Sequence, residues 1–290
     1  MPEAAPSRVL ASLGIPESAF LGSGAEAQVY ALDARRVARI HSPGVARADV
    51  SGRAALLSEL AAGARAVPFA IPQVLDIAAV DDRLVSIEAR LPGRALSEVL
   101  GEASARQRAT LTRAYLDAAA RIGDLRLARA WYGDLSNRDP IRTATFRDYL
   151  RERARKSLEV AGPAFAAVEA GGLAAALPEP ASPALVHLDA FPGNMLAEGG
   201  AISAVLDFGS VSIMGDRRLD PLTAAAYLDS AITPSATAAD RRAASEWLEE
   251  RQLIHWYPPA RRWLAAYWSF AREDPRLFEW CRRILLPPAA

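Results

Sequence analysis

Residues 186–194 read Val-His-Leu-Asp-Ala-Phe-Pro-Gly-Asn, and residues 206–209 read Leu-Asp-Phe-Gly. Together the two stretches offer an Asp, an Asn and a second Asp, each next to a β-like run and a glycine. Phosphoryl transfer from a nucleotide needs such a set, because one carboxylate takes the proton of the attacking hydroxyl while other oxygens hold a metal across the phosphates. The two stretches therefore predict a phosphotransferase-like centre.

The composition fits an ordinary globular protein with a large core or two lobes. The chain has 290 residues, of which 51% are hydrophobic and 23% are charged. Acidic and basic residues balance at 34 each, so no global charge favours nucleic acid or an anionic membrane as the main partner. Almost all basic residues are arginines, and Lys156 is the single lysine.

The single cysteine and the lack of long apolar runs favour a cytoplasmic protein. Cys281 has no partner for a disulfide within the chain, which indicates a reducing compartment. Residues 1–7 lack the basic patch and apolar run of a secretory signal, and no apolar stretch approaches the roughly 20 residues of a membrane span. We expect a monomer or a homodimer.

The chain changes character near residue 92. Before it, short β-like runs surround one helical pattern at 50–64, with strands expected at 20–24, 28–32, 36–40, 73–80 and 83–88. After Leu91-Pro92-Gly93, helices are expected at 103–127, 145–160 and 163–177, followed by a strand-rich interruption at 184–206 and four helices from about 220 to 286. We expect two lobes, residues 1–91 and 92–290, with a cleft between them.

The two motifs resemble those of the aminoglycoside phosphotransferase family, whose fold is similar to that of protein kinases. The resemblance implies an α+β, bilobal fold with a five-stranded antiparallel N-lobe sheet and a helical C-lobe. It implies that Asp189 is the catalytic base, that Asn194 and Asp207 bind Mg²⁺, and that His187 orients the loop. Leu188 stands where the family usually has glycine, so we expect a slightly different loop shape.

Weaker signals in the N-terminal half fit a nucleotide-binding lobe for ATP or GTP. Gly22-Ser23-Gly24-Ala25-Glu26-Ala27 resembles a kinase glycine loop, whose backbone amides cover phosphates. Arg39 stands where kinases place a lysine that contacts the α- and β-phosphates. By resemblance, the backbone around Glu88 and Arg90 joins the lobes and binds the purine edge.

The helical partner of Arg39 is left open by the sequence. Kinases place a glutamate on the helix that follows the basic strand, but the best register here puts Arg53 at that position. Glu59 lies further along the same helix and is a candidate partner.

Two further segments extend the resemblance, which runs from about Phe20 to Trp280. Residues 215–220, Gly-Asp-Arg-Arg-Leu-Asp, resemble a segment whose acids brace the catalytic and metal loops. Tyr132-Gly133 and residues 139–142 resemble an inter-helix segment of bacterial members. Asp134 and Asp139 flank a loop that could face the substrate.

Other residues receive plainer interpretations. His41 and His255 lack partners at metal-ligand spacing and are interpreted as structural or surface residues. The aromatic residues of 247–280 are expected mostly in the core, with a few lining a substrate pocket.

The acceptor is not fixed by the motifs. An aminoglycoside- or macrolide-type antibiotic leads, and sparse acidic residues near the C-terminus weaken the case for a polycation. A choline-, homoserine- or fructosamine-type metabolite is an alternative. A kinase-like module that binds nucleotide without turnover is a second alternative, suggested by Leu188 and the missing helical glutamate.

Overall fold

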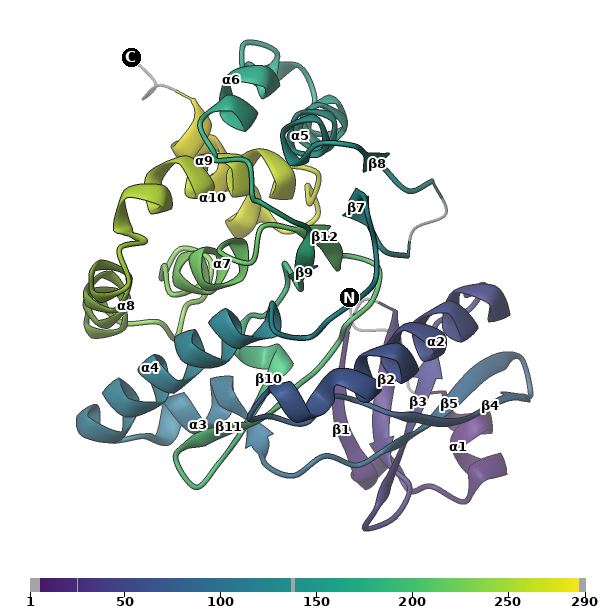
Figure 1. Cartoon of the computed structure of the whole chain (residues 1–290). Coiled ribbons are helices and arrows are strands. Elements are labelled where there is room, and N and C mark those ends of the chain that lie inside the picture. Colours follow the sequence, from purple (N-terminus) through teal and green to yellow (C-terminus); the bar gives the residue numbers. More distant parts are fainter. Residues whose placement is uncertain (1–5, 25, 137–138, 287–290) are drawn as a thin grey trace.

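The computed structural model describes residues 6–24, 26–136 and 139–286. Its N-terminal part is a five-stranded antiparallel sheet in the order β1-β2-β3-β5-β4 (Figure 1). The strands are β1 Phe20–Ser23, β2 Ala27–Ala31, β3 Arg36–His41, β4 Val74–Val80 and β5 Arg83–Ala89. The five expected strands and their antiparallel arrangement are therefore confirmed.

The two faces of this sheet differ because side chains alternate along a strand. Ala38 and Ile40 of β3 belong to a small core with Val9 and Leu10 of α1 (Ser7–Leu13), a helix that the sequence analysis did not predict. Arg39, between them in the sequence, lies on the opposite face. That face meets α2 (Arg47–Gly63), because Arg53 of α2 reaches Glu88 of β5.

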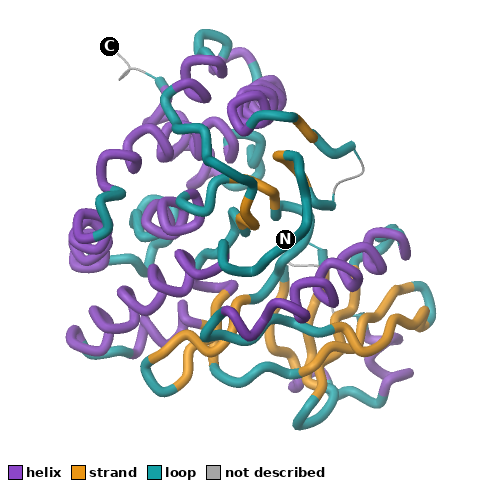
Figure 2. Tube along the Cα trace, viewed as in Figure 1, coloured by secondary structure: helices purple, strands orange, loops and turns teal. Residues whose placement is uncertain are grey.

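The rest of the chain is mainly helical, with two small sheets (Figure 2). Its helices are α3 Leu96–Glu102, α4 Ala105–Ile122, α5 Phe146–Ala161, α6 Ala170–Ala175, α7 Leu219–Tyr227, α8 Ala238–Glu250, α9 Tyr257–Trp268 and α10 Pro275–Leu285. Its strands are β6 Arg94–Ala95, β7 Tyr132–Asp134, β8 Arg142–Thr143, β9 Ala184–Val186, β10 Met195–Glu198, β11 Ala201–Val205 and β12 Ile213–Gly215. The four helices expected after residue 220 are confirmed as α7 to α10.

The single helix expected at 163–177 is wrong. The chain forms a 3-10 turn at Pro163–Phe165 and the short helix α6 instead. Gly171 and Gly172 explain the weakness of this segment, since glycine is a poor helix former.

The aromatic residues of the last helices are largely core, as expected. Trp247, Trp263 and Trp280 are almost fully buried in one large cluster that spans the helical part. Each indole N–H finds an acceptor: Trp263 donates to the Leu150 carbonyl at 2.9 Å, and Trp247 and Trp280 donate to carboxylates. These pairs satisfy the polar edge of a buried indole.

The small sheets hold the predicted catalytic segment between the two parts of the molecule. β9 ends at Val186, and the β10–β11 hairpin separates Asn194 from Leu206. Ala70, which follows α2, forms a bridge with Ala204 of β11, so the hairpin is joined to the N-terminal part by backbone hydrogen bonds. Among the described residues, none of the helices combines the length and the apolar composition of a membrane span.

Candidate active site

The loop that carries Asp189 is fixed from below by a buried carboxylate. Asp220, in the first turn of α7, accepts hydrogen bonds from the backbone N–H groups of His187 and Leu188 at 2.9–3.0 Å. Burial raises the pKa of Asp220 to about 7 despite these donors. The acid of segment 215–220 that braces the loop is thus Asp220, whereas Asp216 pairs with Arg218.

Leu188 adopts the backbone conformation that glycine favours. Its φ is +62°, in the left-handed region, and its side chain is almost fully buried. The backbone at this position is therefore left-handed, as a glycine would allow, and not in the ordinary right-handed conformation. Leucine holds the unusual angle itself.

His187 links the two motifs through its ring. Its Nε2 lies 2.7 Å from the carbonyl oxygen of Leu206, and its Nδ1 lies 3.2 Å from the backbone nitrogen of Asp189. Because a carbonyl only accepts, Nε2 carries the proton and Nδ1 accepts from Asp189. Burial lowers the pKa of His187, which favours this neutral ring.

Asp189 has two side-chain donors. Tyr227 O–H donates to its Oδ1 at 2.8 Å, and Asn194 Nδ2 donates to its Oδ2 at 3.0 Å. Burial and the nearby charge of Asp207 nevertheless raise the pKa of Asp189 to about 6, against the two hydrogen bonds. A carboxylate with a pKa near neutrality suits a general base.

Tyr227 was missed by the sequence analysis. It lies at the end of α7, two helical turns after Asp220, so both side chains face the catalytic loop. That helical spacing from Asp220 is the signal that could have found it. Phe191 and Trp268 lie beside the Tyr227 ring, at centroid distances of 5.8 and 4.9 Å.

Asn194 and Asp207 offer oxygen atoms of the kind that Mg²⁺ prefers. The Leu206 N–H donates to the Asn194 carbonyl at 2.8 Å. Because Asp207 directly follows Leu206, this hydrogen bond keeps the backbones of Asn194 and Asp207 close together. Since Asn194 directs its amide nitrogen at Asp189, its amide oxygen is the atom suited to a cation. Asp207, with a φ of +62°, presents its carboxylate to Arg39.

Arg39 and Asp207 form an ion pair between the N-terminal sheet and the helical part. Arg39 Nη2 lies 2.6 Å from Asp207 Oδ1. Although burial opposes it, the charges of Arg39 and Arg53 lower the pKa of Asp207, so Asp207 is a carboxylate. The structure thus brings Arg39 to Asp189, Asn194 and Asp207, although Arg39 lies 168 positions before Asp207 in the sequence.

The helical partner of Arg39 is not Glu59. Glu59 binds Arg129 at 2.7 and 3.0 Å, so the candidate pair of Glu59 with Arg39 is wrong. Arg53, at the expected glutamate position, binds Glu88 at 2.7 Å. The helix therefore supplies a cation and β5 supplies the anion.

The other nucleotide-binding candidates lie in the N-terminal sheet. Gly22, Ser23 and Gly24 form the β1 side of the glycine turn, next to β2, whose Val29 pairs with Arg39. Ala25 of the predicted loop lies outside the described residues. Glu88 directs its side chain to Arg53, and the Arg90 N–H donates to the Arg35 carbonyl at 2.8 Å. The Arg90 N–H is thus already engaged within the N-terminal part and does not offer a donor to a purine.

Asp134 is tied into the protein. It accepts from the Tyr149 hydroxyl at 3.1 Å and from the Ile141 N–H at 3.0 Å, and it is 3% exposed. Asp139 pairs with Lys156 at the surface. His41 Nε2 lies 3.1 Å from Ser86 Oγ and donates to it, because the hydroxyl proton of Ser86 goes to Glu88. His41 is buried, as expected for a structural residue.

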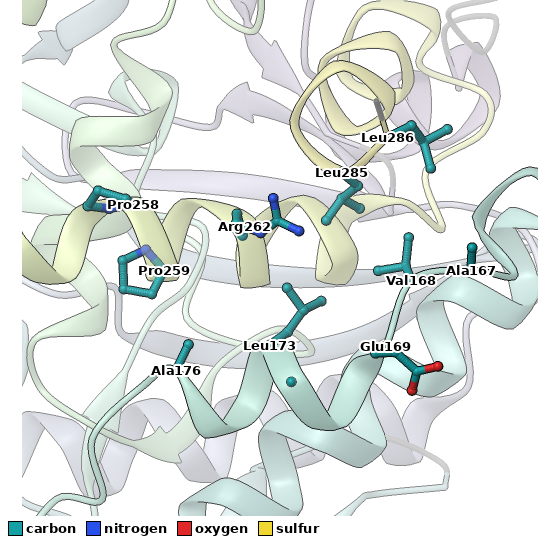
Figure 3. A pocket seen from close by; sticks show the side chains of 11 residues that line it. Ala167, Val168, Glu169, Leu173, Ala176, Pro258, Pro259, Arg262, Leu285 and Leu286 are labelled. Carbon is teal, nitrogen blue, oxygen red and sulfur yellow. The ribbon is translucent and has the colours of Figure 1, made fainter. Parts of the chain in front are cut away.

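A pocket of about 620 Å³ lies away from these residues (Figure 3). It opens between α6, the start of α9 and the end of α10, and it is mostly apolar apart from Glu169 and Arg262. Pro258 of this pocket is at the start of α9, and Trp268, which lies beside Tyr227, is at the end of that helix. At the rise of an α-helix, the backbones of Pro258 and Trp268 are about 15 Å apart. The pocket therefore does not adjoin Asp189.

Comparison with solved structures shows the same fold. The chain superimposes on the gentamicin complex of APH(2″)-IIa with a TM-score of 0.60 at 14% identity, covering 99% of this chain and 97% of that one. A thermostable mutant of the aminoglycoside phosphotransferase APH(4)-Ia gives 0.57 at 18% identity, covering 96% and 98%. A protein assigned as a fructosamine-3-kinase, from Haemophilus somnus 129PT, gives 0.56 at 14%, covering 97% and 96%.

Comparison of sequences places the chain in a family. A search of curated proteins finds no significant match. The model of the phosphotransferase enzyme family matches residues 18–273, which include the glycine turn, both motifs and most of the C-terminal helices. The expected α+β, protein-kinase-like fold is confirmed, and the chain belongs to the phosphotransferase enzyme family as a small-molecule kinase that acts on hydroxyl groups.

Proposed function

We propose that this kinase transfers the γ-phosphate of ATP or GTP, bound with Mg²⁺, to a hydroxyl of its acceptor, with Asp189 as the base. The observation that carries the proposal is the connected set of Asp189, Asn194 and Asp207. Asn194 donates to Asp189, its carbonyl accepts from Leu206, and Asp207 follows directly. This continuity supports the proposal, because phosphoryl transfer would need a proton acceptor beside two oxygen ligands.

Asp189 would orient the acceptor hydroxyl and take its proton. Its Oδ1 and Oδ2 already accept from Tyr227 and Asn194, and each carboxylate oxygen can accept a further hydrogen bond. The two donors fix the carboxylate plane, so that the carboxylate is held in place before the acceptor arrives.

Asn194 and Asp207 would hold Mg²⁺ through a carboxylate and an amide oxygen, which fits the preference of this ion for few protein ligands plus phosphates. When bound, Mg²⁺ would neutralise charge on the phosphates. Arg39 would turn part of its guanidinium from Asp207 to the phosphates, because it has five donors and lies beside the metal ligand. Of residues 22–24, the Gly24 N–H already donates to the Ala27 carbonyl at 2.9 Å, so a backbone donor to the phosphates would come from Gly22 or Ser23.

For the acceptor we propose a hydroxylated antibiotic of the aminoglycoside or macrolide type. The structural neighbours include an aminoglycoside phosphotransferase bound to gentamicin. The rings of Phe191 and Trp268 flank Tyr227, whose hydroxyl binds Asp189, and these aromatic surroundings favour an acceptor with an apolar face. A metabolite kinase is the second candidate, supported by the likeness to the protein assigned as a fructosamine-3-kinase.

The test of the base is turnover by Asp189→Asn. We expect a loss of kcat on the order of 10²- to 10⁴-fold with an acceptor identified from a panel of antibiotics and metabolite alcohols, because the amide cannot take the proton. Phosphate transfer is measured with Mg²⁺ and either ATP or GTP. Asp82→Asn is the control, since that carboxylate is 78% exposed and lies in the β4–β5 turn.

Two outcomes would contradict the proposal. Full activity of Asp189→Asn would show that another group is the base. Binding of nucleotide by the unaltered protein without turnover over the whole panel would favour a catalytically silent module. The expectations of a cytoplasmic location and of a monomer or homodimer stay predictions.

A further inference from the structure

We infer that Arg53 and Glu88 form a positioning pair for phosphoryl transfer. Arg53 neutralises Glu88, so that Arg39 stays available to Asp207 and the nucleotide phosphates. The inference rests on the proposed function. Arg53 and Glu88 bind each other with the cation on the helix and the anion on a strand, which is opposite to the kinase pattern of strand lysine and helix glutamate.

The pair is buried and well formed. Arg53 Nη1 lies 2.7 Å from Glu88 Oε1, and Arg53 Nη2 lies 3.4 Å from Glu88 Oε2, in a forked geometry. The side chains are 11% and 7% exposed. Ser86 Oγ also donates to Glu88 Oε1, at 3.1 Å. The carboxylate of Glu88 is therefore occupied from two elements, α2 and β5.

Arg39 is within electrostatic reach of Glu88. Arg39 pairs with Ser86 in the sheet register, and Glu88 is the next residue of β5 on the same face. Although burial opposes it, the charges of Asp207 and Glu88 raise the pKa of Arg39. Arg39 Nε has no hydrogen-bond partner in the described chain. A Glu88 without Arg53 would therefore be a buried, uncompensated carboxylate next to an arginine that can turn to it.

Arg53 also passes close to the metal-binding motif. A Cβ atom placed on Gly209 would lie 3.9 Å from Arg53 Cδ, which is ordinary van der Waals contact. The side chain thus runs from α2, past the segment that follows Asp207, to β5. Arg53 thus connects α2 to β5, the strand that pairs with the strand of Arg39, and lies near the backbone that follows Asp207.

The consequence is a division of labour between two arginines and two carboxylates. Arg53 neutralises Glu88, and Arg39 neutralises Asp207 until nucleotide and metal arrive. Loss of Arg53 should draw Arg39 towards Glu88 and away from the phosphates. Loss of both Arg53 and Glu88 charges should leave Arg39 on Asp207.

The experiment measures binding of the magnesium complexes of two non-hydrolysable analogues, AMP-PNP and GMP-PNP, by calorimetry, and kcat and KM with the acceptor in use. Arg53→Met should weaken analogue binding about tenfold and lower kcat/KM about ten- to a hundredfold, as a misplaced phosphate-binding group would. Arg53→Met/Glu88→Gln should recover binding to within about threefold of the unaltered protein, because nonadditivity is expected for residues in contact.

Arg108→Met is the matched control for a structural role. Arg108 forms a forked, largely buried ion pair with Asp240 at 2.7 Å, between α4 and α8. It should lower the melting temperature without changing the analogue Kd. Should Arg53→Met not fold, Arg53→Lys replaces it, since an ammonium group keeps the charge without the fork and should weaken binding less than tenfold.

The outcomes separate the inference from the proposed function. Analogue binding by Arg53→Met equal to that of the unaltered protein overturns the inference. A double variant that binds the analogue as weakly as Arg53→Met also overturns the inference. Failure of the unaltered protein to bind either analogue instead overturns the proposed function, and the inference with it.

Discussion

At the scale of single residues, Leu188 and Asp189 show how a strained loop is held. Leu188 occupies the left-handed region at a cost of roughly 1 kcal/mol for a non-glycine residue. Its buried side chain and the hydrogen bond from its N–H to Asp220 offset this cost. The strain is local to the peptide that precedes Asp189, which is where a catalytic loop needs an unusual turn.

The pKa of Asp189 makes a prediction about pH. The base acts as the carboxylate, so kcat/KM should fall as the pH falls through about 6. The hydrogen bond from Tyr227 lowers the pKa of Asp189. Its removal in Tyr227→Phe should therefore raise that pKa and move the acid limb of the pH–rate profile upward, by about one unit.

The control for this pH prediction is Tyr132→Phe. The Tyr132 hydroxyl donates to the Pro180 carbonyl at 3.2 Å and has no contact with Asp189 in the described chain. The acid limb of the pH–rate profile of Tyr132→Phe should therefore stay where it is in the unaltered protein. An acid limb of Tyr227→Phe that stays in place or moves downward would contradict the assigned role of Tyr227.

At the scale of elements, short strands and one helix carry the site more than the long helices do. α7 supports the loop through Asp220 at its start and Tyr227 at its end. β12 pairs with both β9 and β7, so the strand that leads into Asp189 is joined to the β7–β8 hairpin. Elements of three residues are stable here because the helical core covers them.

Gly133 makes a prediction about the β7–β8 hairpin. Its φ is +133°, and a Cβ atom at this position would lie 1.9 Å from the Ile141 carbonyl oxygen, a backbone atom that cannot turn aside. Gly133→Ala should lower the free energy of unfolding by about 2 to 4 kcal/mol, measured by urea denaturation.

Gly52→Ala is the matched control for Gly133→Ala. Gly52 lies in the interior of α2, and a Cβ atom there meets nothing within 4 Å. The substitution should raise the free energy of unfolding by about 0.5 to 1 kcal/mol, because alanine favours a helix. Equal stability of Gly133→Ala and the unaltered protein would show that the hairpin backbone can adjust.

At the scale of the whole molecule, several polar contacts between described residues join the N-terminal part to the helical part. They include the Arg39–Asp207 ion pair, the Glu59–Arg129 ion pair and the backbone bridge of Ala70 to Ala204. The first of these is also the proposed site of metal and phosphate binding. Ligand binding and the joining of the two parts are therefore coupled through the same side chains.

Magnesium nucleotide should stabilise the whole protein against heat. At a hundredfold excess over Kd, a ligand that binds only the folded state adds about 2.7 kcal/mol. We expect a rise of several degrees in melting temperature with Mg²⁺ and ATP or GTP, measured by differential scanning fluorimetry, and loss of turnover when a chelator removes the metal.

Asp207→Asn should remove most of the dependence of this thermal shift on Mg²⁺, because an amide is a weaker magnesium ligand than a carboxylate. A thermal shift with nucleotide that is the same with Mg²⁺ and with chelator, in the unaltered protein, would contradict metal binding at Asp207.

The sequence by itself determined the family, the five-stranded sheet and the presence of both motifs, because glycine turns, alternating strands and short polar motifs are local patterns. Only the tertiary structure decided the partners of the charges. Glu59 binds Arg129, Arg53 binds Glu88, and Tyr227 binds Asp189. Such pairings depend on which faces of distant elements meet, and an ion pair forms wherever packing brings opposite charges together, which no local pattern records.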